Sequence, residues 1–258
     1  GRLSPGGIFA VNTETGEVLD QSTIDDQLKQ QKPYREWLKK SAVYLESTLD
    51  AFEGPSIKKM LHADLITASK LFSLFNEERV SVIKPLANAG MEGTGSMGDD
   101  TALAVLSSMP RSIYDYFRQQ FAQVTNPPID SLRETSVMSL ETCFGPELNI
   151  FEETQDHAKR IVSTSPVLSH RKLNSLLNNS FFSVESFELV YSPKLQLKDA
   201  LANLTNKVVK AVRKGVVIIH LNEILPKGDT LSINALLAVG CIHQELVKLG
   251  LRSDANLV

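Results

Sequence analysis

The stretch Val216-Val217-Ile218-Ile219-His220-Leu221 decides the fold class of this chain. Its first four residues are apolar on both faces of an extended chain, which is typical of a strand covered by helices on each side. Helical patterns over 195–214 and 233–249 flank it, and another apolar strand begins at 255–258. Strands that alternate with helices usually form parallel sheets. The sequence therefore predicts an α/β fold whose second half is a parallel sheet with flanking helices.

The first residues of the chain predict a β-hairpin followed by a helix. Short apolar strands at 8–12 and 17–19 surround a turn in which Gly16 can adopt a positive φ. Ser22 or Thr23 is then expected to cap the helix, because a hydroxyl can accept a free backbone N–H of the first turn.

A second helix is predicted over 34–49, and the break at 53–56 (Glu-Gly-Pro-Ser) predicts a domain boundary. The chain is thereby divided into residues 1–53 and 54–258. Further helices are expected at 63–75, 76–90, 102–106 and 112–124, and further strands at 160–163 and 187–191.

Composition excludes several classes of protein. The 258 residues are 42% hydrophobic and 22% charged, which is ordinary globular usage. The formal net charge of −3 argues against a nucleic-acid partner, because phosphate binding needs a clustered basic surface. No apolar run approaches the ~20 residues of a membrane helix. The polar start at 1–5 predicts no signal peptide, and both ends look like cuts through a longer cytoplasmic polypeptide.

One glycine-rich motif could bind a nucleotide. Residues 93–98 (Gly-Thr-Gly-Ser-Met-Gly) form a G-x-G-x-x-G pattern, which cradles a pyrophosphate when a strand runs directly into it. The preceding residues 87–92 do not form a strand pattern, and Asp99 and Asp100 would repel a phosphate. A tight loop that opens a helix is the simpler interpretation, and an independent nucleotide- or flavin-binding enzyme is the alternative.

The titratable residues give no complete catalytic or metal-binding pattern. None of the five histidines has a histidine partner four residues away, and no cysteine stands at metal-site spacing. Cys143 and Cys241 are expected to be reduced, buried thiols. Cys143 could act as a nucleophile if His157 lay beside it, but the sequence does not place that base.

The densest stretch, residues 114–130, combines an aromatic face with uncharged amides. Phe117 and Phe121 share one face of the predicted helix, and Gln119, Gln120 and Gln123 surround it. Amides do not titrate, so this pattern favours a neutral polar lining or a protein interface over acid–base chemistry, with a solvated helix face as the simpler alternative.

Three blocks of the chain resemble the large chain of the glutamate synthase family. The first block, 95–101 with 104–107 and 114–134 (YDYFRQQFAQVTNPPIDSLRE), resembles the start of its central domain. The second, 3–11 with Lys32-Pro33-Tyr34, resembles the tail of its glutamine amidotransferase domain. The third, 251–256, resembles the entry to its FMN-binding barrel. The resemblance covers essentially the whole chain in order. A free-standing interaction module would instead require natural ends at 1 and 258.

The resemblance implies a role inside a larger enzyme. In the family, glutamine is hydrolysed in one domain, and ammonia passes through a tunnel to a flavin domain. There it adds to 2-oxoglutarate, and reduction gives glutamate. The central domain, described as a reduced relative of the flavin barrel, joins the two sites. The resemblance thus implies a partial, TIM-barrel-like sheet here, and FMN and a 3Fe-4S cluster in the whole enzyme. Ferredoxin or a small electron-donating subunit would supply electrons.

The chain itself lacks the parts that perform this chemistry. Gly1 stands where a nucleophilic cysteine would begin the chain, and two cysteines cannot hold an iron–sulfur cluster. No catalytic, cofactor-binding or metal-binding residue is therefore expected. The candidates for the tunnel or the domain interface are Gly95, Ser96, Met97, Gly98, Asp99, Asp100, Thr101, Gln119, Gln123, Thr125, Asn126, Asp130 and Arg133.

Overall fold

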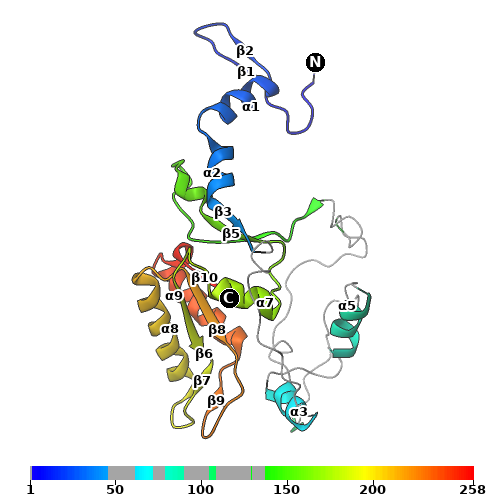
Figure 1. Cartoon of the computed structure of the whole chain (residues 1–258), viewed down its shortest axis with the longest axis vertical. Helices are drawn as coiled ribbons and strands as arrows, with labels where there is room; N and C mark the ends of the chain where they lie inside the picture. The colour runs from blue at the N-terminus through cyan, green and yellow to red at the C-terminus, as the bar shows by residue number, and fades with distance from the viewer. Residues whose placement is uncertain (1, 46–61, 72–78, 90–104, 109–128, 130–136) are drawn as a thin grey trace.

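The computed structural model describes residues 2–45, 62–71, 79–89, 105–108, 129 and 137–258. The described part is a mixed α/β structure with four small sheets (Figure 1). Two of these sheets form the body of the molecule, and a hairpin and two helices at the N-terminus extend from it.

The largest packed unit is the parallel sheet that the sequence predicts. It contains β6 (Val184–Glu188), β8 (Ile218–Asn222) and β10 (Asn256–Leu257) in the order β10-β8-β6. Both pairings are parallel. The crossovers are α8 (Leu197–Arg213) and α9 (Ala235–Lys248), close to the predicted helices. The chain therefore makes two consecutive β-α-β units, as predicted.

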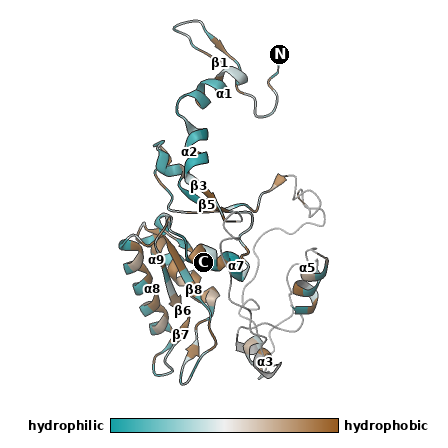
Figure 2. Ribbon diagram, viewed as in Figure 1, coloured by the Kyte–Doolittle hydropathy of each residue, from teal (hydrophilic) through white to brown (hydrophobic). Residues whose placement is uncertain are grey.

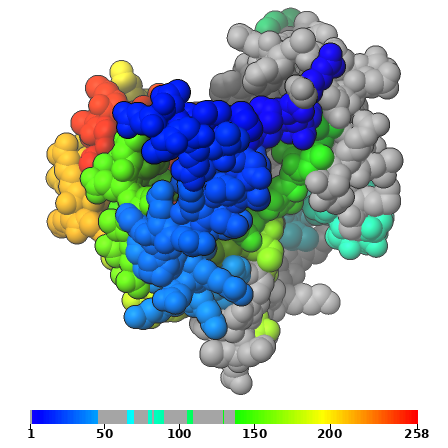
Figure 3. Space-filling view, turned by 90° about the horizontal axis from the view of Figure 1, so that it is seen from above, coloured from blue at the N-terminus to red at the C-terminus, as the bar shows by residue number. Residues whose placement is uncertain are grey.

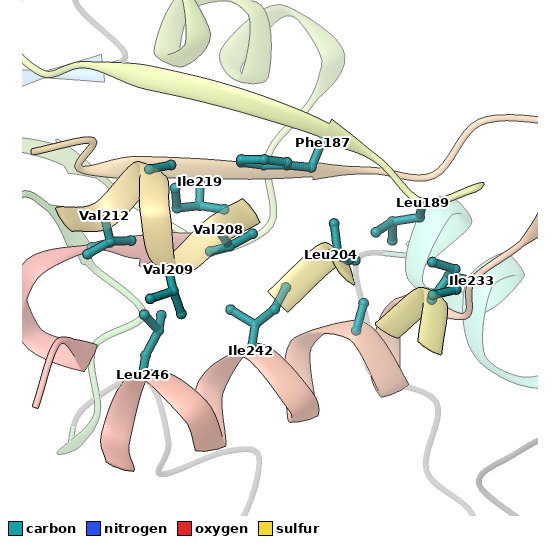
Figure 4. Close-up of a cluster of buried hydrophobic side chains, with 14 residues drawn as sticks. Phe187, Leu189, Leu204, Val208, Val209, Val212, Ile219, Ile233, Ile242 and Leu246 are labelled. Carbon is teal, nitrogen blue, oxygen red and sulfur yellow. The ribbon is translucent and has the colours of Figure 1, made fainter. Parts of the chain in front are cut away.

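One face of this sheet packs against α8 and α9 (Figure 4). Phe187 and Ile219 point from the strands toward Val208 of α8, and Ile242 and Leu246 of α9 complete the cluster. The buried positions on α9 recur every four residues, so the helix presents one apolar stripe to the core. Each fully buried aliphatic side chain contributes about 1.5–3 kcal/mol to folding.

The opposite face of the sheet meets a second sheet through a smaller cluster. That sheet contains β3 (Ala42–Tyr44), β5 (Arg160–Ser163) and β4 (Thr142–Phe144), with β5 in the middle. β3 is parallel to β5 and β4 is antiparallel to it. Leu45, Phe144 and Ile161 pack with Leu176 of α7 (His170–Leu177) and with Ile218. Residues from both halves of the chain therefore share this cluster.

The helix predicted over 34–49 is wrong at residues 42–45, and residues 46–49 lie outside the described part of the chain. α2 ends at Ser41 (Tyr34–Ser41), and residues 42–44 form β3. Val43 and Tyr44 are strand-favouring residues, and pairing with β5 supplies the hydrogen bonds that helix continuation would have given. Leu45 is buried, but it lies outside α2.

The N-terminal hairpin is confirmed, with β1 (Ala10–Val11) antiparallel to β2 (Val18–Leu19) and Gly16 at φ +71°. The cap of the following helix is not Ser22 or Thr23. Asp20 caps α1 (Gln21–Gln30) by accepting the Thr23 N–H at 2.9 Å. Both hydroxyls donate to the same carboxylate, since they already lie in the first turn. Figure 2 shows that α1 and α2 are largely hydrophilic.

The strand predicted at 160–163 is confirmed, and the one predicted at 187–191 is divided. β6 ends at Glu188, and β7 (Val190–Tyr191) pairs antiparallel with β9 (Leu231–Ser232). The residue between them, Leu189, is buried and bonds to both Asn222 and Ile233 through its backbone.

The described parts of the middle region are α3 (His62–Leu71), the π-helix η2 (Arg79–Ile83) and α5 (Lys84–Ala89). Val105 and Leu106 lie in a turn rather than in the predicted short helix. The helix predicted at 112–124 and the boundary predicted near 53 lie outside the described residues.

Candidate functional site

All of the predicted tunnel and interface residues lie outside the described residues. They are Gly95, Ser96, Met97, Gly98, Asp99, Asp100, Thr101, Gln119, Gln123, Thr125, Asn126, Asp130 and Arg133. The G-x-G-x-x-G motif at 93–98 lies there as well. Those assignments stay predictions, and the described residues supply other candidates.

The first candidate is a contact between the start of α2 and the loop before the 3₁₀ helix η4 (Gln155–Ala158), called here the Glu153 junction (Lys32, Tyr34, Trp37, Glu153 and His157). Lys32 Nζ donates to the Glu153 carbonyl at 2.5 Å and lies 3.7 Å from its carboxylate. The Tyr34 hydroxyl donates to the same carboxylate. One residue thus accepts from two donors about 120 residues earlier in the chain.

Aromatic packing surrounds these polar contacts. Tyr34 and Trp37 meet edge to face with their ring centroids 5.7 Å apart, a favoured aromatic arrangement. A hollow of about 370 Å³ lies beside them, lined also by Leu38, Ile150 and Ala158. In Figure 3, the blue N-terminal residues lie beside the green residues that follow 137. The junction therefore combines charge, a hydroxyl and an aromatic face.

His157 forms hydrogen bonds within its own loop and does not act as a base for Cys143. Its Nδ1 accepts the Thr154 N–H at 3.3 Å and lies 3.0 Å from the Thr154 hydroxyl. Its Nε2 lies 3.0 Å from the Asn149 carbonyl. Since both ring nitrogens are engaged within residues 149–157, the hypothesis that His157 activates Cys143 is wrong.

The environment of Cys143 also opposes a nucleophilic role. Partial desolvation of the Cys143 sulfur by its neighbours raises the pKa of the thiol although the residue as a whole is exposed, and the Glu141 carboxylate raises the pKa further, so the reactive thiolate is disfavoured. Both cysteines are free, as predicted, but the expected burial is wrong because both are exposed. Cys143 alternates with the buried Phe144 on β4, and Cys241 lies off the buried stripe of α9.

The second candidate, called here the Asn256 junction, links the end of the chain to the second sheet (Gly145, Glu147, Arg160, Ser253 and Asn256). Gly145 N–H donates to the Asn256 side chain at 2.8 Å, and Glu147 N–H donates to the Ser253 carbonyl at 2.7 Å. Arg160 of β5 lies 3.8 Å from Glu147. The segment after β4 is thereby attached to the residues that lead into β10.

A polar pair lies on the parallel sheet. Ser186 Oγ of β6 lies 3.0 Å from His220 Nδ1 of β8. Burial lowers the pKa of His220, so the neutral ring is favoured near neutral pH. The pair joins neighbouring strands, and among the described residues no carboxylate is hydrogen-bonded to His220 to orient it as a base for Ser186. We assign it a structural role.

A groove of about 730 Å³ runs between α8 and α9, lined by residues that include Leu201, Asn206, Cys241 and Gln244. In the part of the chain that the structure describes, no three His, Cys, Asp or Glu residues gather closely enough to hold a metal ion. Cys143 and Cys241 lie on separate elements, so the chain's cysteines do not fit an iron–sulfur cluster. None of the helices formed by described residues is long and apolar enough to span a membrane.

The fold and the two junctions define the class of this chain as an α/β unit in which β3 and the C-terminal end lie in different sheets and pack on one small buried cluster. Comparison with known families identifies the family to which this unit belongs. A family model described as the glutamate synthase central domain matches residues 67–258, and one described as class-II glutamine amidotransferases matches residues 1–37. The chain belongs to the glutamate synthase family.

Individual relatives agree with this assignment over the whole chain. A chloroplastic ferredoxin-dependent glutamate synthase of Oryza sativa subsp. japonica is 36% identical over 271 residues, covering 100% of this chain and 16% of that protein. Ferredoxin-dependent glutamate synthase 2 of a Synechocystis strain is 38% identical, with 100% and 17% covered. The NADH glutamate synthase of Saccharomyces cerevisiae is 32% identical, with 100% and 13% covered. The chain therefore spans about a sixth of these relatives.

Sequence reasoning missed Glu153, Gly145 and Asn256 as junction residues. Lys32-Pro33-Tyr34 stood out only through its family resemblance, and nothing near it in the sequence identifies a partner 120 residues later. The loop itself carries a usable signal. Thr154 and, three residues later, His157 form a reciprocal cap in which histidine takes the place of the usual glutamate or glutamine of a capping box.

Proposed function

We propose that this chain is the central domain of a glutamate synthase, preceded by the tail of its amidotransferase domain, with the domains at 54–258 and 1–53. The whole enzyme would convert glutamine, 2-oxoglutarate and a reductant into two molecules of glutamate. The chain supplies no catalytic residue and is inactive alone. Its role is to join the glutaminase site to the flavin site and to line the ammonia path between them.

The observation that carries this proposal is that Leu45, which directly follows β3, and Val258, at the C-terminal end, pack in one buried cluster. The residues that follow the amidotransferase match form β3, which pairs with β5. The residues that lead into β10 are bonded to the segment after β4 through Asn256 and Ser253. A domain that holds two other domains at a fixed separation needs this kind of attachment at each end.

A barrel-like origin of the central domain fits the order of its strands. In the sheet, β6, β8 and β10 lie side by side in the order in which they occur along the chain. Helices cross over between them, as in consecutive units of a TIM barrel. Three strands would form only part of a barrel. The proposal of a partial, TIM-barrel-like sheet rests on this order.

Cofactors and electron donors belong, in this proposal, to the other parts of the enzyme. FMN would bind in the barrel that follows, and a 3Fe-4S cluster elsewhere, since the cysteines of this chain do not fit one. Relatives named for ferredoxin and for NADH both match, so the sequence match is compatible with either donor. We place the enzyme in the cytoplasm, with its amidotransferase and flavin domains as the partners of this chain.

The tunnel role is tested at Thr125 in the full-length enzyme. Neutral side chains suit ammonia in transit, since an ionised carboxylate would hold it as ammonium. Thr125→Trp is expected to block the path, so that glutamine is hydrolysed without matching glutamate formation. Thr125→Ser, which keeps a small hydroxyl, is the control. Glutamine consumed and glutamate formed are measured together, and tight coupling in the tryptophan variant would contradict the tunnel role.

A simpler measurement separates this proposal from an independent flavin- or nucleotide-binding enzyme. The absorbance spectrum of the purified chain is recorded before and after addition of FMN. A colourless protein with no FMN-induced change is expected. A bound flavin would favour the alternative and would make residues 93–98 the place to mutate.

A further inference from the structure

Glu153 is placed to receive a specific pair of donors. A carboxylate and a carbonyl only accept hydrogen bonds, and both acceptors of Glu153 are used by the ammonium of Lys32 and the hydroxyl of Tyr34. Hydrogen bonds to an ionised group are stronger than neutral ones. The side chain of the neighbouring Glu152 accepts from Asn149, within its own loop. Two adjacent carboxylates thus face different parts of the chain.

The loop that carries Glu153 is held in shape by its own residues. Asn149 accepts the Phe151 N–H at 3.1 Å and donates to Glu152 at 3.0 Å. Thr154 and His157 form the reciprocal cap of η4. The receiving side is therefore arranged by contacts that do not involve residues 32–37.

Few other side-chain contacts stabilise the donor segment, residues 32–37. α1 and α2 contain no buried residue, and the apolar side chains of the hairpin are about half exposed. Beside the junction, Ile150 and Phe151 are 82% and 89% exposed. A further polar contact between α2 and the first residue of η4 runs from Gln155 to Ser41 at 3.4 Å. Apart from its direct continuation into β3, α2 is therefore attached to the described chain mainly by the lysine–tyrosine pair and the Trp37 packing.

From this arrangement we propose that Glu153 is a docking residue, through which the central domain holds the Lys32–Tyr34 pair and so positions the amidotransferase-family segment. The proposal deepens the proposed function and rests on it for the identity of the segment. Glu153 acts by position and takes no part in chemistry. Its carboxylate neutralises the lysine and fixes the tyrosine, and the tyrosine ring in turn orients Trp37.

The chain contains its own reporter of this contact, because Trp37 is its one tryptophan. Ionised tyrosine quenches a nearby tryptophan by energy transfer, and the Tyr34 ring lies 5.7 Å away. The hydrogen bond to Glu153 raises the pKa of Tyr34, and the carboxylate's charge adds to this. Quenching of Trp37 in the 258-residue chain therefore reports the titration of Tyr34 in the docked state.

The experiment compares Glu153→Gln with Glu152→Gln, which removes the adjacent charge. In the Glu153 variant, quenching of Trp37 is expected at a lower pH than in the wild type, because the negative charge that opposes tyrosinate is gone. The Glu152 variant is expected to match the wild type. Tyr34→Phe should abolish the part of the Trp37 quenching that comes from ionised Tyr34, which shows that Tyr34 is the quencher.

Hydrogen exchange gives a second readout of docking at neutral pH. The amides of α2 are expected to exchange roughly twofold to fivefold faster in Glu153→Gln, the loss of a charged hydrogen bond at an exposed site. Those of α8 should not change. Identical quenching profiles and identical α2 exchange in the two variants would overturn the proposal. Neither readout uses glutamine or 2-oxoglutarate, so a failed docking site and a failed functional assignment are separate results.

Discussion

The two ends of the described chain are stabilised in different ways. Residues 184–258 bury a continuous cluster between a parallel sheet and two helices. Residues 2–41 bury no side chain, and their order comes from a helix cap, a two-stranded hairpin and the Glu153 junction. The comparison teaches that one end carries its own core, whereas the other depends on what it contacts. Substitutions in the C-terminal core should therefore change the stability of the chain more than substitutions at the N-terminal end, whose effects should stay local.

The largest effect is expected in the C-terminal core. Ile242 is 0% exposed between α8, α9 and the sheet, so Ile242→Ala should lower the free energy of unfolding by about 2–5 kcal/mol. Chemical denaturation measures this loss. Val247, on the same helix but 52% exposed, is the control, and Val247→Ala should change stability by less than about 0.5 kcal/mol. Equal losses at the two sites would show that α9 does not pack as described.

A middle-sized effect is expected at the Asn256 junction. Gly145 has φ +148°, and a Cβ there would lie 2.8 Å from the Arg160 guanidinium and 3.2 Å from the Lys159 carbonyl. Gly145→Ala should therefore destabilise the chain by about 1–3 kcal/mol, because the backbone would have to shift at the residue whose N–H donates to Asn256.

The matched glycine for that experiment lies in α9. A Cβ at Gly240 would meet nothing within 4 Å, and its backbone is helical. Gly240→Ala should stabilise the chain by about 0.5–1 kcal/mol, because alanine loses less backbone entropy in a helix. Thermal unfolding of both variants tests the pair. A stabilising Gly145→Ala would contradict the close approach of Arg160.

The smallest effect is expected at the N-terminal end. Backbone and side-chain hydrogen bonds from Thr23 lower the pKa of Asp20, followed by the bond from Ser22. A carboxyl whose pKa is lowered by folding stabilises the folded form above its ordinary pKa near 3.8, and this contribution is lost as the pH falls through the lowered value. Asp20→Ala should remove it at every pH.

The measurement for Asp20 is amide exchange along α1: protection, expressed relative to the intrinsic exchange rate at the same pH, should fall several-fold in the variant, and in the wild type it should fall as the pH is lowered. Global unfolding of the C-terminal core should stay unchanged, because the cap is far from that core in the chain and fully exposed. Asp25→Ala, which removes a carboxylate from the same helix but not from the cap, is the control. A fall in core stability in Asp20→Ala would contradict the separation of the two ends.

The accuracy of the sequence analysis follows the same division. The β-α-β order of 184–258 could be predicted because its helices show local periodicity and its strands a continuous apolar run. β3 could not, because Val43 and Tyr44 become a strand only by pairing with β5. α7 was missed although Ser169 caps it and Leu173 and Leu176 lie on one face, a signal that was present in the sequence.

The candidate site could be predicted only as far as family resemblance reached. The resemblance identified Lys32-Pro33-Tyr34, but the residue that receives it is set by tertiary structure. The role proposed for Cys143 depended on where His157 lies, and spacing alone cannot fix that. The tunnel residues lie outside the described residues, so Thr125 and its neighbours remain predictions.

The pairing of β3 with β5 has a consequence for synthesis of the chain. Lys32 and Glu153 are separated by 121 residues, and β3 and β5 are separated by a similar length. At about 5–20 residues per second, a ribosome needs roughly 6–24 seconds to add that length. Until then β3 has neither its partner strand nor the Glu153 loop. During translation, the edge of β3 therefore stays unpaired until β5 has been made, and this sheet can form only after synthesis of β5.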